Sequence, residues 1–147
     1  MNDVYCKDVE AIEKYLRKVD YIIRRKGREI LNDLNITGPQ FSALQILINN
    51  GEMTIGELSQ KMALACSTIT DLIDRMEKAE LVVRKKDEKD KRVVRIEVLT
   101  KGYDILDKVL YKRREFLNNK ISDFAAEDKK TLNKGLEALY EAMKDEL

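Results

Sequence analysis

The chain has 147 residues, of which 44% are hydrophobic and 37% are charged, and its net charge is +1. This composition, with one proline and six glycines, excludes a disordered or fibrous protein and is typical of a helix-rich globular unit of about one domain. No stretch approaches the roughly 20 apolar residues of a membrane span, and the acidic start of the chain lacks the basic and apolar regions of a signal peptide. We therefore expect a cytoplasmic protein with no membrane partner.

Two features that many enzymes use, histidine and a phosphate-binding glycine loop, are missing. The chain has no histidine, so neither a Ser-His nor a Cys-His pair can form, and it has no glycine-rich loop for phosphate. Its two cysteines, Cys6 and Cys66, lie far apart in the sequence and are expected to be reduced thiols. The sequence therefore predicts no catalytic residue, no metal site and no cofactor.

Apolar residues recur at steps of three and four along residues 1–34, which predicts one long amphipathic helix. Two capping boxes then predict the next two helices. Thr37 and Gln40 flank an early-turn proline and open the first of these helices, which is expected to end at the Asn-Asn-Gly sequence 49–51. Thr54 and Glu57 open a short helix of about two turns. The apolar residues of the first helix are Val9, Ile12, Leu16, Val19, Ile23, Ile30 and Leu34.

A fourth helix is predicted to begin near Ser67 and to complete a helix-turn-helix. Its apolar stripe comprises Ile69, Leu72, Ile73 and Met76. Its opposite face comprises Ser67, Thr68, Thr70, Asp71, Asp74, Arg75 and Lys78. An ordinary solvated face explains these polar residues. However, a short capped helix, a tight turn at 63–66 and a second helix also form the arrangement whose second helix enters a DNA major groove.

Two β-branched runs, 81–83 and 93–99, predict a hairpin that we call the wing. The residues from Arg84 to Arg92 are all charged and are expected at its tip. Residues 82–101 carry eight basic and four acidic groups, a net +4, which is the patch that an anionic partner would meet. Its cations can contact phosphates or a minor groove, although charges also protect an exposed edge from aggregation. The basic residues of the tip are Lys85, Lys86, Lys89, Lys91 and Arg92.

The remaining helices carry more apolar surface than a winged helix needs. Thr100 is expected to cap a helix whose apolar face comprises Tyr103, Leu106, Leu110, Phe116, Leu117 and Ile121. The last helix has Leu132, Leu136, Leu139, Tyr140, Met143 and Leu147. The expected fold is mainly α with a small β-hairpin wing: residues 35–100 form the winged helix, and 1–34 and 101–147 pair with a second copy in a C2 homodimer. A monomer with these helices packed on their own wing domain is the alternative.

Over residues 9–145 the sequence resembles the MarR family of bacterial transcriptional regulators. The matching stretches are LSQKMALACSTITDLIDRMEKAELVVRKKD at 58–87 and DKRVVRIEVLTKGYDIL at 90–106. The wing motif Asp90-Lys-Arg92, which runs on to Leu99-Thr-Lys-Gly102, is the more specific of the two. The resemblance implies one MarR-type domain, residues 1–147, that dimerises and binds a pseudo-palindromic operator in double-stranded DNA, usually as a repressor. It also implies a small-molecule effector, whose identity and pocket residues the sequence does not give.

The resemblance assigns functional residues as well. On the fourth helix, the residues that would face the major groove or its phosphates are Ser67, Thr68, Thr70, Asp71 and Arg75. On the wing, Arg92 would reach a minor groove while Asp90 holds it, and the charge run adds Lys89 and Lys91 as contacts to DNA. The alternative function is a winged-helix dimer that acts through protein contacts and not through DNA.

The sequence departs from the family at the ends of two helices. Glu80 stands where the family usually has glycine after the fourth helix. A left-handed residue there would cost glutamate roughly 1 kcal/mol more than glycine, so the helix is expected to run on or to end differently. The last helix follows Ala125 where many relatives have a Ser or Thr cap, although Glu127 and Asp128 suit its positive end.

The cysteines allow two interpretations. One branch of the family senses peroxide through a cysteine near the start of its first helix, with help from tyrosines, and Cys6 has Tyr5, Tyr15 and Tyr21 nearby. The spacing does not reproduce that branch's motif, so an incidental thiol is the alternative. Cys66 is expected to pack at the turn before the fourth helix.

Overall fold

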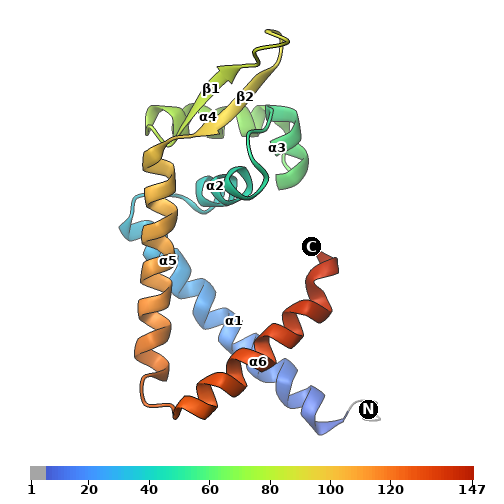
Figure 1. Cartoon of the computed structure of the whole chain (residues 1–147), viewed down its shortest axis with the longest axis vertical. Helices are drawn as coiled ribbons and strands as arrows, with labels where there is room; N and C mark the ends of the chain where they lie inside the picture. Colours follow the sequence, from blue (N-terminus) through green and yellow to red (C-terminus); the bar gives the residue numbers. More distant parts are fainter. Residues whose placement is uncertain (1–5) are drawn as a thin grey trace. The chain divides into compact units, whose positions relative to one another are not determined.

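The structure, a computed structural model, describes residues 6–147 (Figure 1). The chain divides between Tyr111 and Lys112 into two compact units. The first unit holds α1 (Lys7–Asp33), α2 (Gly38–Asn50), α3 (Ile55–Met62), α4 (Cys66–Lys78), β1 (Val82–Lys86), β2 (Val94–Val98) and the first half of α5 (Thr100–Ile121). The second unit holds the rest of α5, α6 (Ala126–Met143) and a 3-10 turn, Lys144–Glu146. The mainly α fold with one hairpin is therefore confirmed.

The core of the first unit is built from one face of each helix and of the hairpin. The fourth helix contributes Ile69, Ile73 and Met76, all fully buried, while Leu72 is half-buried. This arrangement confirms the stripe expected from the sequence. No polar or charged residue is buried among residues 6–147, so the core is held by apolar burial alone. The other large side chains with full burial are Leu44, Leu58, Val82, Ile96 and Val109.

The capping box of α2 forms as expected. The Thr37 hydroxyl accepts a hydrogen bond from the backbone N–H of Gln40 (3.2 Å), and the Gln40 side chain accepts one from the backbone N–H of Thr37 (3.1 Å). The box expected at α3 is only half formed. Thr54 accepts from the backbone N–H of Glu57 (3.1 Å), but the Glu57 carboxylate accepts from the Thr54 hydroxyl (3.3 Å) and faces Arg95 (3.9 Å).

The end of α4 corrects an expectation. Glu80 adopts the left-handed conformation with φ 63°, so the helix ends as a glycine would end it. The backbone N–H of Leu81 donates to the carbonyl of Met76 (2.9 Å), and that of Glu80 donates to the carbonyl of Glu77 (3.0 Å). This is a Schellman motif, and the two buried side chains Leu81 and Met76 supply its apolar contact. Burial of that pair offsets the backbone cost at Glu80.

The wing is an antiparallel hairpin whose register runs from Val82 opposite Val98 to Lys86 opposite Val94. The charged run had been expected at the tip of the wing. The first strand extends through Lys86, so this run begins inside the strand. The sequence also gave no sign of a third pairing segment. Met53, just before α3, pairs with Ile96, whose backbone N–H donates to the Met53 carbonyl (2.8 Å). The inner edge of β2 is thereby tied to the helix-turn-helix.

Helix α5 begins at Thr100, so Thr100 is its first helical residue and not its cap. The carbonyl of Leu99 accepts the first hydrogen bonds, from Gly102 (2.9 Å) and Tyr103 (3.3 Å). The buried positions are Gly102 and Val109, whereas Tyr103, which was expected on the apolar face, is exposed. A Cβ at Gly102 would lie 2.7 Å from the Leu81 carbonyl oxygen, so glycine permits the close approach of α5 to the core.

Two other helices present apolar side chains to solvent. Along α1 the exposed apolar residues include Val9, Ile12, Leu16, Val19 and Ile23. In the second unit, α6 follows Ala125 without a side-chain cap and carries Glu127 and Asp128 in its first turn. Its exposed apolar residues are Leu132, Leu136, Tyr140 and Met143. None of the helices in the described range is long and apolar enough to cross a membrane.

Candidate nucleic-acid interface

Helix α4 exposes all five of the side chains assigned to it from the resemblance. Ser67, Thr68, Thr70, Asp71 and Arg75 are exposed because the opposite side of the helix is buried in the core. The turn before α4 places Ala63 in the left-handed conformation, φ 53°, and the Ser59 hydroxyl donates to the Leu64 carbonyl. This turn sets α4 against α3, as a helix-turn-helix requires.

Thr70 has a hydrogen bond of its own within α4. Its hydroxyl donates to the carbonyl of Cys66 (2.9 Å), one turn earlier. The proton of this hydroxyl is therefore in use, and the side chain offers its oxygen lone pairs and its methyl group to a ligand. Cys66 is exposed at the start of α4, so the expectation that it packs at the turn is wrong.

Two aspartates organise the tip of the wing, residues 87–93. The Asp87 carboxylate accepts from the backbone N–H groups of Lys89 (3.2 Å) and Asp90 (3.0 Å). The Asp90 carboxylate accepts from the backbone N–H of Arg92 (3.1 Å) and from its guanidinium (3.1 and 3.2 Å). The Asp90–Arg92 contact that the resemblance implies is therefore present in the structure. The two carboxylates fold the loop so that its lysines lie outside.

The same contacts set the acidity of these carboxyls. The backbone N–H of Asp90, with help from Arg95, lowers the pKa of Asp87 below its ordinary value. The side chain and then the backbone N–H of Arg92 lower the pKa of Asp90 in the same way. Both groups are therefore ionised throughout the neutral range, because a hydrogen bond to a carboxylate favours its charged form.

Arg84 joins the wing to α4, which sequence reasoning missed. Its guanidinium lies 2.6 Å from an Asp74 oxygen and 3.3 Å from a Glu77 oxygen. Its backbone N–H also donates to Glu77 (2.9 Å). Arg84 appeared in the sequence as one more member of the charge run, because nothing in the spacing shows that positions 84, 77 and 74 meet. We call this cluster of Arg84, Asp74 and Glu77 the hairpin clasp.

A different arginine holds the tip loop of the wing. The Arg95 guanidinium lies 3.5 Å from Asp87 and 3.9 Å from Glu57, so it connects β2 with the tip loop and with α3. The three arginines of the wing, Arg84, Arg92 and Arg95, are thus all paired with carboxylates. Their positive charge is partly neutralised inside the protein.

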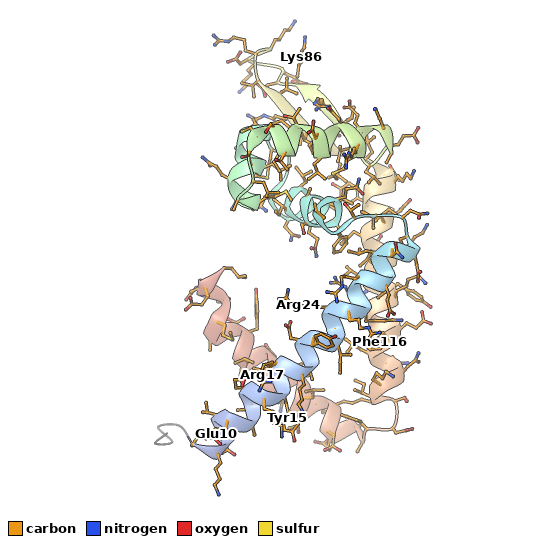
Figure 2. The ribbon with its side chains drawn as sticks, turned by 180° about the vertical axis from the view of Figure 1, so that it is seen from behind. Glu10, Tyr15, Arg17, Arg24, Lys86 and Phe116 are labelled. Atoms are coloured by element: carbon orange, nitrogen blue, oxygen red, sulfur yellow. The ribbon has the colours of Figure 1, made fainter. Side chains whose placement is uncertain are left out.

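The lysines of the wing are not neutralised in this way. Within the described residues, Lys85, Lys86, Lys89 and Lys91 are exposed and form no ion pair. Figure 2 shows Lys86 at the far end of the hairpin, away from α4. An open hollow of about 340 Å³ on this side is lined by Glu52, Lys85, Lys86, Asp87, Glu88, Lys89 and Arg95. The assigned DNA contacts are exposed. They lie on two neighbouring elements, α4 and the wing, which are drawn beside each other in Figure 1.

Comparison with known proteins agrees with this architecture. The sequence model of the MarR family matches residues 36–94. The HTH-type transcriptional regulator YsmB of Bacillus subtilis is 54% identical over 136 residues, covering 92% of this chain and 93% of the relative.

Solved structures show the same fold. A MarR family protein from Bacillus stearothermophilus superposes with a TM-score of 0.81 at 44% identity, covering 98% of this chain and 99% of that one. A point mutant of MepR from S. aureus, solved bound to an oligodeoxyribonucleotide, has a TM-score of 0.73 at 19% identity and covers 90% of this chain and 97% of that one. The chain therefore belongs to the MarR family of DNA-binding winged-helix transcriptional regulators, which are not enzymes.

Proposed function

We propose that the protein is a homodimeric repressor that binds a pseudo-palindromic operator. The observation that carries the proposal is the pair of exposed groups beside each other: the polar face of α4 and a wing whose four lysines have no carboxylate partner within the described residues. Unpaired cations beside a helix of hydroxyl and carboxylate groups suit a duplex, whose backbone is anionic and whose base edges are polar.

The two groups have different tasks in this proposal. Ser67, Thr68, Thr70, Asp71 and Arg75 place α4 in a major groove, where base edges differ. Lys89, Lys91 and Arg92 contact phosphates or an adjacent minor groove, while Asp90 holds the Arg92 side chain in position. The solved complex of the MepR mutant with an oligodeoxyribonucleotide supports this use of the fold.

Dimerisation is proposed from the apolar side chains that the chain leaves exposed. The five α1 residues and the four α6 residues named above each lie in solvent at 40% exposure or more. Fully burying a wholly exposed apolar side chain is favourable by about 1.5–3 kcal/mol, and these side chains, which are about half exposed, would each contribute roughly half of that. A second copy related by a two-fold axis is the simplest partner. It would place two α4 helices about one helical turn of DNA apart.

An effector would act through that separation. A small molecule bound between the dimerisation helices and the winged helix changes DNA binding if its affinity differs between the two dimer geometries. Release of the operator on binding would then derepress transcription.

A salt titration against duplex DNA tests the proposal. The equilibrium constant, measured by fluorescence anisotropy, is expected to fall steeply with salt, with a slope of about 0.9 in log–log form per phosphate neutralised. Arg92→Ala is expected to reduce the magnitude of this slope by about 1, the contribution of one phosphate contact. Its circular dichroism spectrum is expected to match that of the native protein. Arg17→Ala, which removes one exposed guanidinium from α1, is the control for net charge and is expected to keep the native slope.

The same titration separates the alternative function. A winged-helix dimer that acts through protein contacts would show weak binding to duplex DNA and no steep dependence on salt. That outcome at low ionic strength would refute DNA binding as the role of these residues.

A further inference from the structure

The exposed residues in the first two turns of α4 are poor in hydrogen-bond donors. They offer the hydroxyls of Ser67, Thr68 and Thr70 and the carboxylate of Asp71. The side chains that bind guanine or adenine with two hydrogen bonds are Arg, Lys, Asn and Gln. None of these occupies an exposed position in α4 before Arg75. Acceptor sites therefore outnumber donors on this surface, because each hydroxyl can donate one hydrogen bond and the carboxylate can only accept.

Thr70 strengthens this bias. Its hydroxyl proton is directed to the Cys66 carbonyl at 2.9 Å, so its oxygen can only accept a hydrogen bond from a base. Its methyl group remains available for apolar contact. A threonine held in this way is also stiff, because its side-chain torsion is fixed by the intrahelical hydrogen bond.

Asp71 differs from the other two carboxylates of α4. Asp74 and Glu77 are both held by Arg84 in the hairpin clasp. The Asp71 carboxylate, in contrast, is exposed and has no hydrogen-bond or ion-pair partner among residues 6–147. Its charge is therefore not neutralised inside the protein, and a carboxylate beside a polyanion is favourable only where it accepts a hydrogen bond from the nucleic acid.

We propose that Asp71 determines operator specificity by accepting a hydrogen bond from the exocyclic amino group of a cytosine in each half-site, with Thr70 as the neighbouring acceptor. This inference rests on the proposed function and adds the base that α4 selects. In the major groove, cytosine presents the N4 donor alone, whereas guanine and thymine present acceptors that repel a carboxylate. Adenine presents a donor but places its N7 acceptor beside it, so it ranks below cytosine.

The test is selection of bound duplexes from a random pool, carried out in parallel with the native protein and with Asp71→Asn. The native protein is expected to select one position per half-site as cytosine. The asparagine variant is expected to select adenine there, since Asn binds adenine with two hydrogen bonds. Replacing the selected cytosine pair should weaken native binding roughly 5- to 100-fold.

Two further variants exclude a merely structural role. Asp71→Ala is expected to lose the cytosine preference while its affinity for unrelated duplex is unchanged or raised, because a negative charge has been removed. Asp74→Asn, three residues along the same helix, removes a carboxylate that Arg84 already holds. It is expected to keep the cytosine preference even though it loosens the hairpin clasp and lowers the overall affinity, and it is therefore the control for base preference.

The outcomes separate this inference from the proposed function. If the native protein selects no sequence and ignores duplex DNA at low salt, the proposed function fails. If it selects a clear operator but Asp71→Asn selects the same bases at every position, the inference about Asp71 is wrong and DNA binding stands. A native preference for guanine or thymine at the position that Asp71→Asn alters would also overturn it.

Discussion

The hairpin clasp makes the sharpest prediction about how the wing is oriented. Arg84→Gln keeps the backbone N–H donor of residue 84 but removes the guanidinium that bridges Asp74 and Glu77. The wing would then be joined to α4 by its short connection and by the backbone hydrogen bond to Glu77 (2.9 Å). We expect lower stability and weaker operator binding, because one of the contacts that orient the wing against α4 is lost.

The magnitude follows from the exposure of the groups. The Arg84 side chain is 28% exposed, while Asp74 and Glu77 are 51% and 38% exposed, so both ion pairs are partly screened. Pairs of this kind contribute up to about 1 kcal/mol each, well below the roughly 3–5 kcal/mol for breaking a buried pair. Arg84→Gln should therefore cost about 1–2 kcal/mol and lower the melting temperature by roughly 3–6 °C.

The assay compares Arg84→Gln with Lys85→Gln, which removes the neighbouring cation that has no partner in the described residues. Both variants are melted by circular dichroism at one protein concentration and titrated with operator duplex at several salt concentrations. Arg84→Gln should melt earlier and bind more weakly with a near-native salt slope. Lys85→Gln should melt as the native protein does and lose part of that slope. A native melting temperature for Arg84→Gln would refute the clasp as a stabilising contact.

Three other positions give independent tests. Gly102→Ala should lower the free energy of unfolding, measured by chemical denaturation, by about 1–3 kcal/mol, because the new methyl group would lie 2.7 Å from the Leu81 carbonyl oxygen. Gly56→Ala is the control and should leave the stability unchanged, because its methyl group would be in ordinary contact at 3.9 Å. Glu80→Gly should stabilise by about 1 kcal/mol, since residue 80 has φ 63°; an unchanged or lower melting temperature would contradict this. Arg92 lowers the pKa of the Asp90 carboxyl. The ionised carboxylate should therefore hold the wing tip fully in place at pH values above its ordinary pKa of about 3.9 and release it as the pH falls through its lower folded-state pKa. Carboxyl NMR shifts that titrate at the ordinary value would refute this.

Local signals in the sequence were reliable where the interaction itself is local. Thr37 and Gln40 meet across one helical turn, so the capping box could be read from their spacing. The buried stripe of α4 follows the helical period in the same way. The Asp90–Arg92 contact also spans only two residues, although it was expected from the family resemblance and not from the spacing. Each of these depends on backbone geometry that a helix or a tight loop fixes in advance.

Interactions between distant segments could not be predicted in this way. The Arg84 contact with Asp74 and the pairing of Met53 with Ile96 depend on how the hairpin packs against the helices. The left-handed Glu80 shows the same limit, because its backbone cost was correctly expected while the burial of Leu81 that offsets it was not visible. For the candidate site, the exposed face of α4 was predictable, and the family resemblance implied the contact of Asp90 with Arg92. The pairing of Arg84 and Arg95 with carboxylates was not predictable. The absence of such partners at the four wing lysines, among the described residues, was not predictable either.

The most direct test of the central claim moves the two half-sites of the selected operator apart by about five base pairs, half a turn of B-DNA. Affinity is measured by fluorescence anisotropy with duplexes of equal length and composition. If two α4 helices in one dimer read both half-sites, the insertion rotates one site to the opposite face and binding falls to the level of unrelated duplex. Retention of full affinity would contradict paired reading by a dimer.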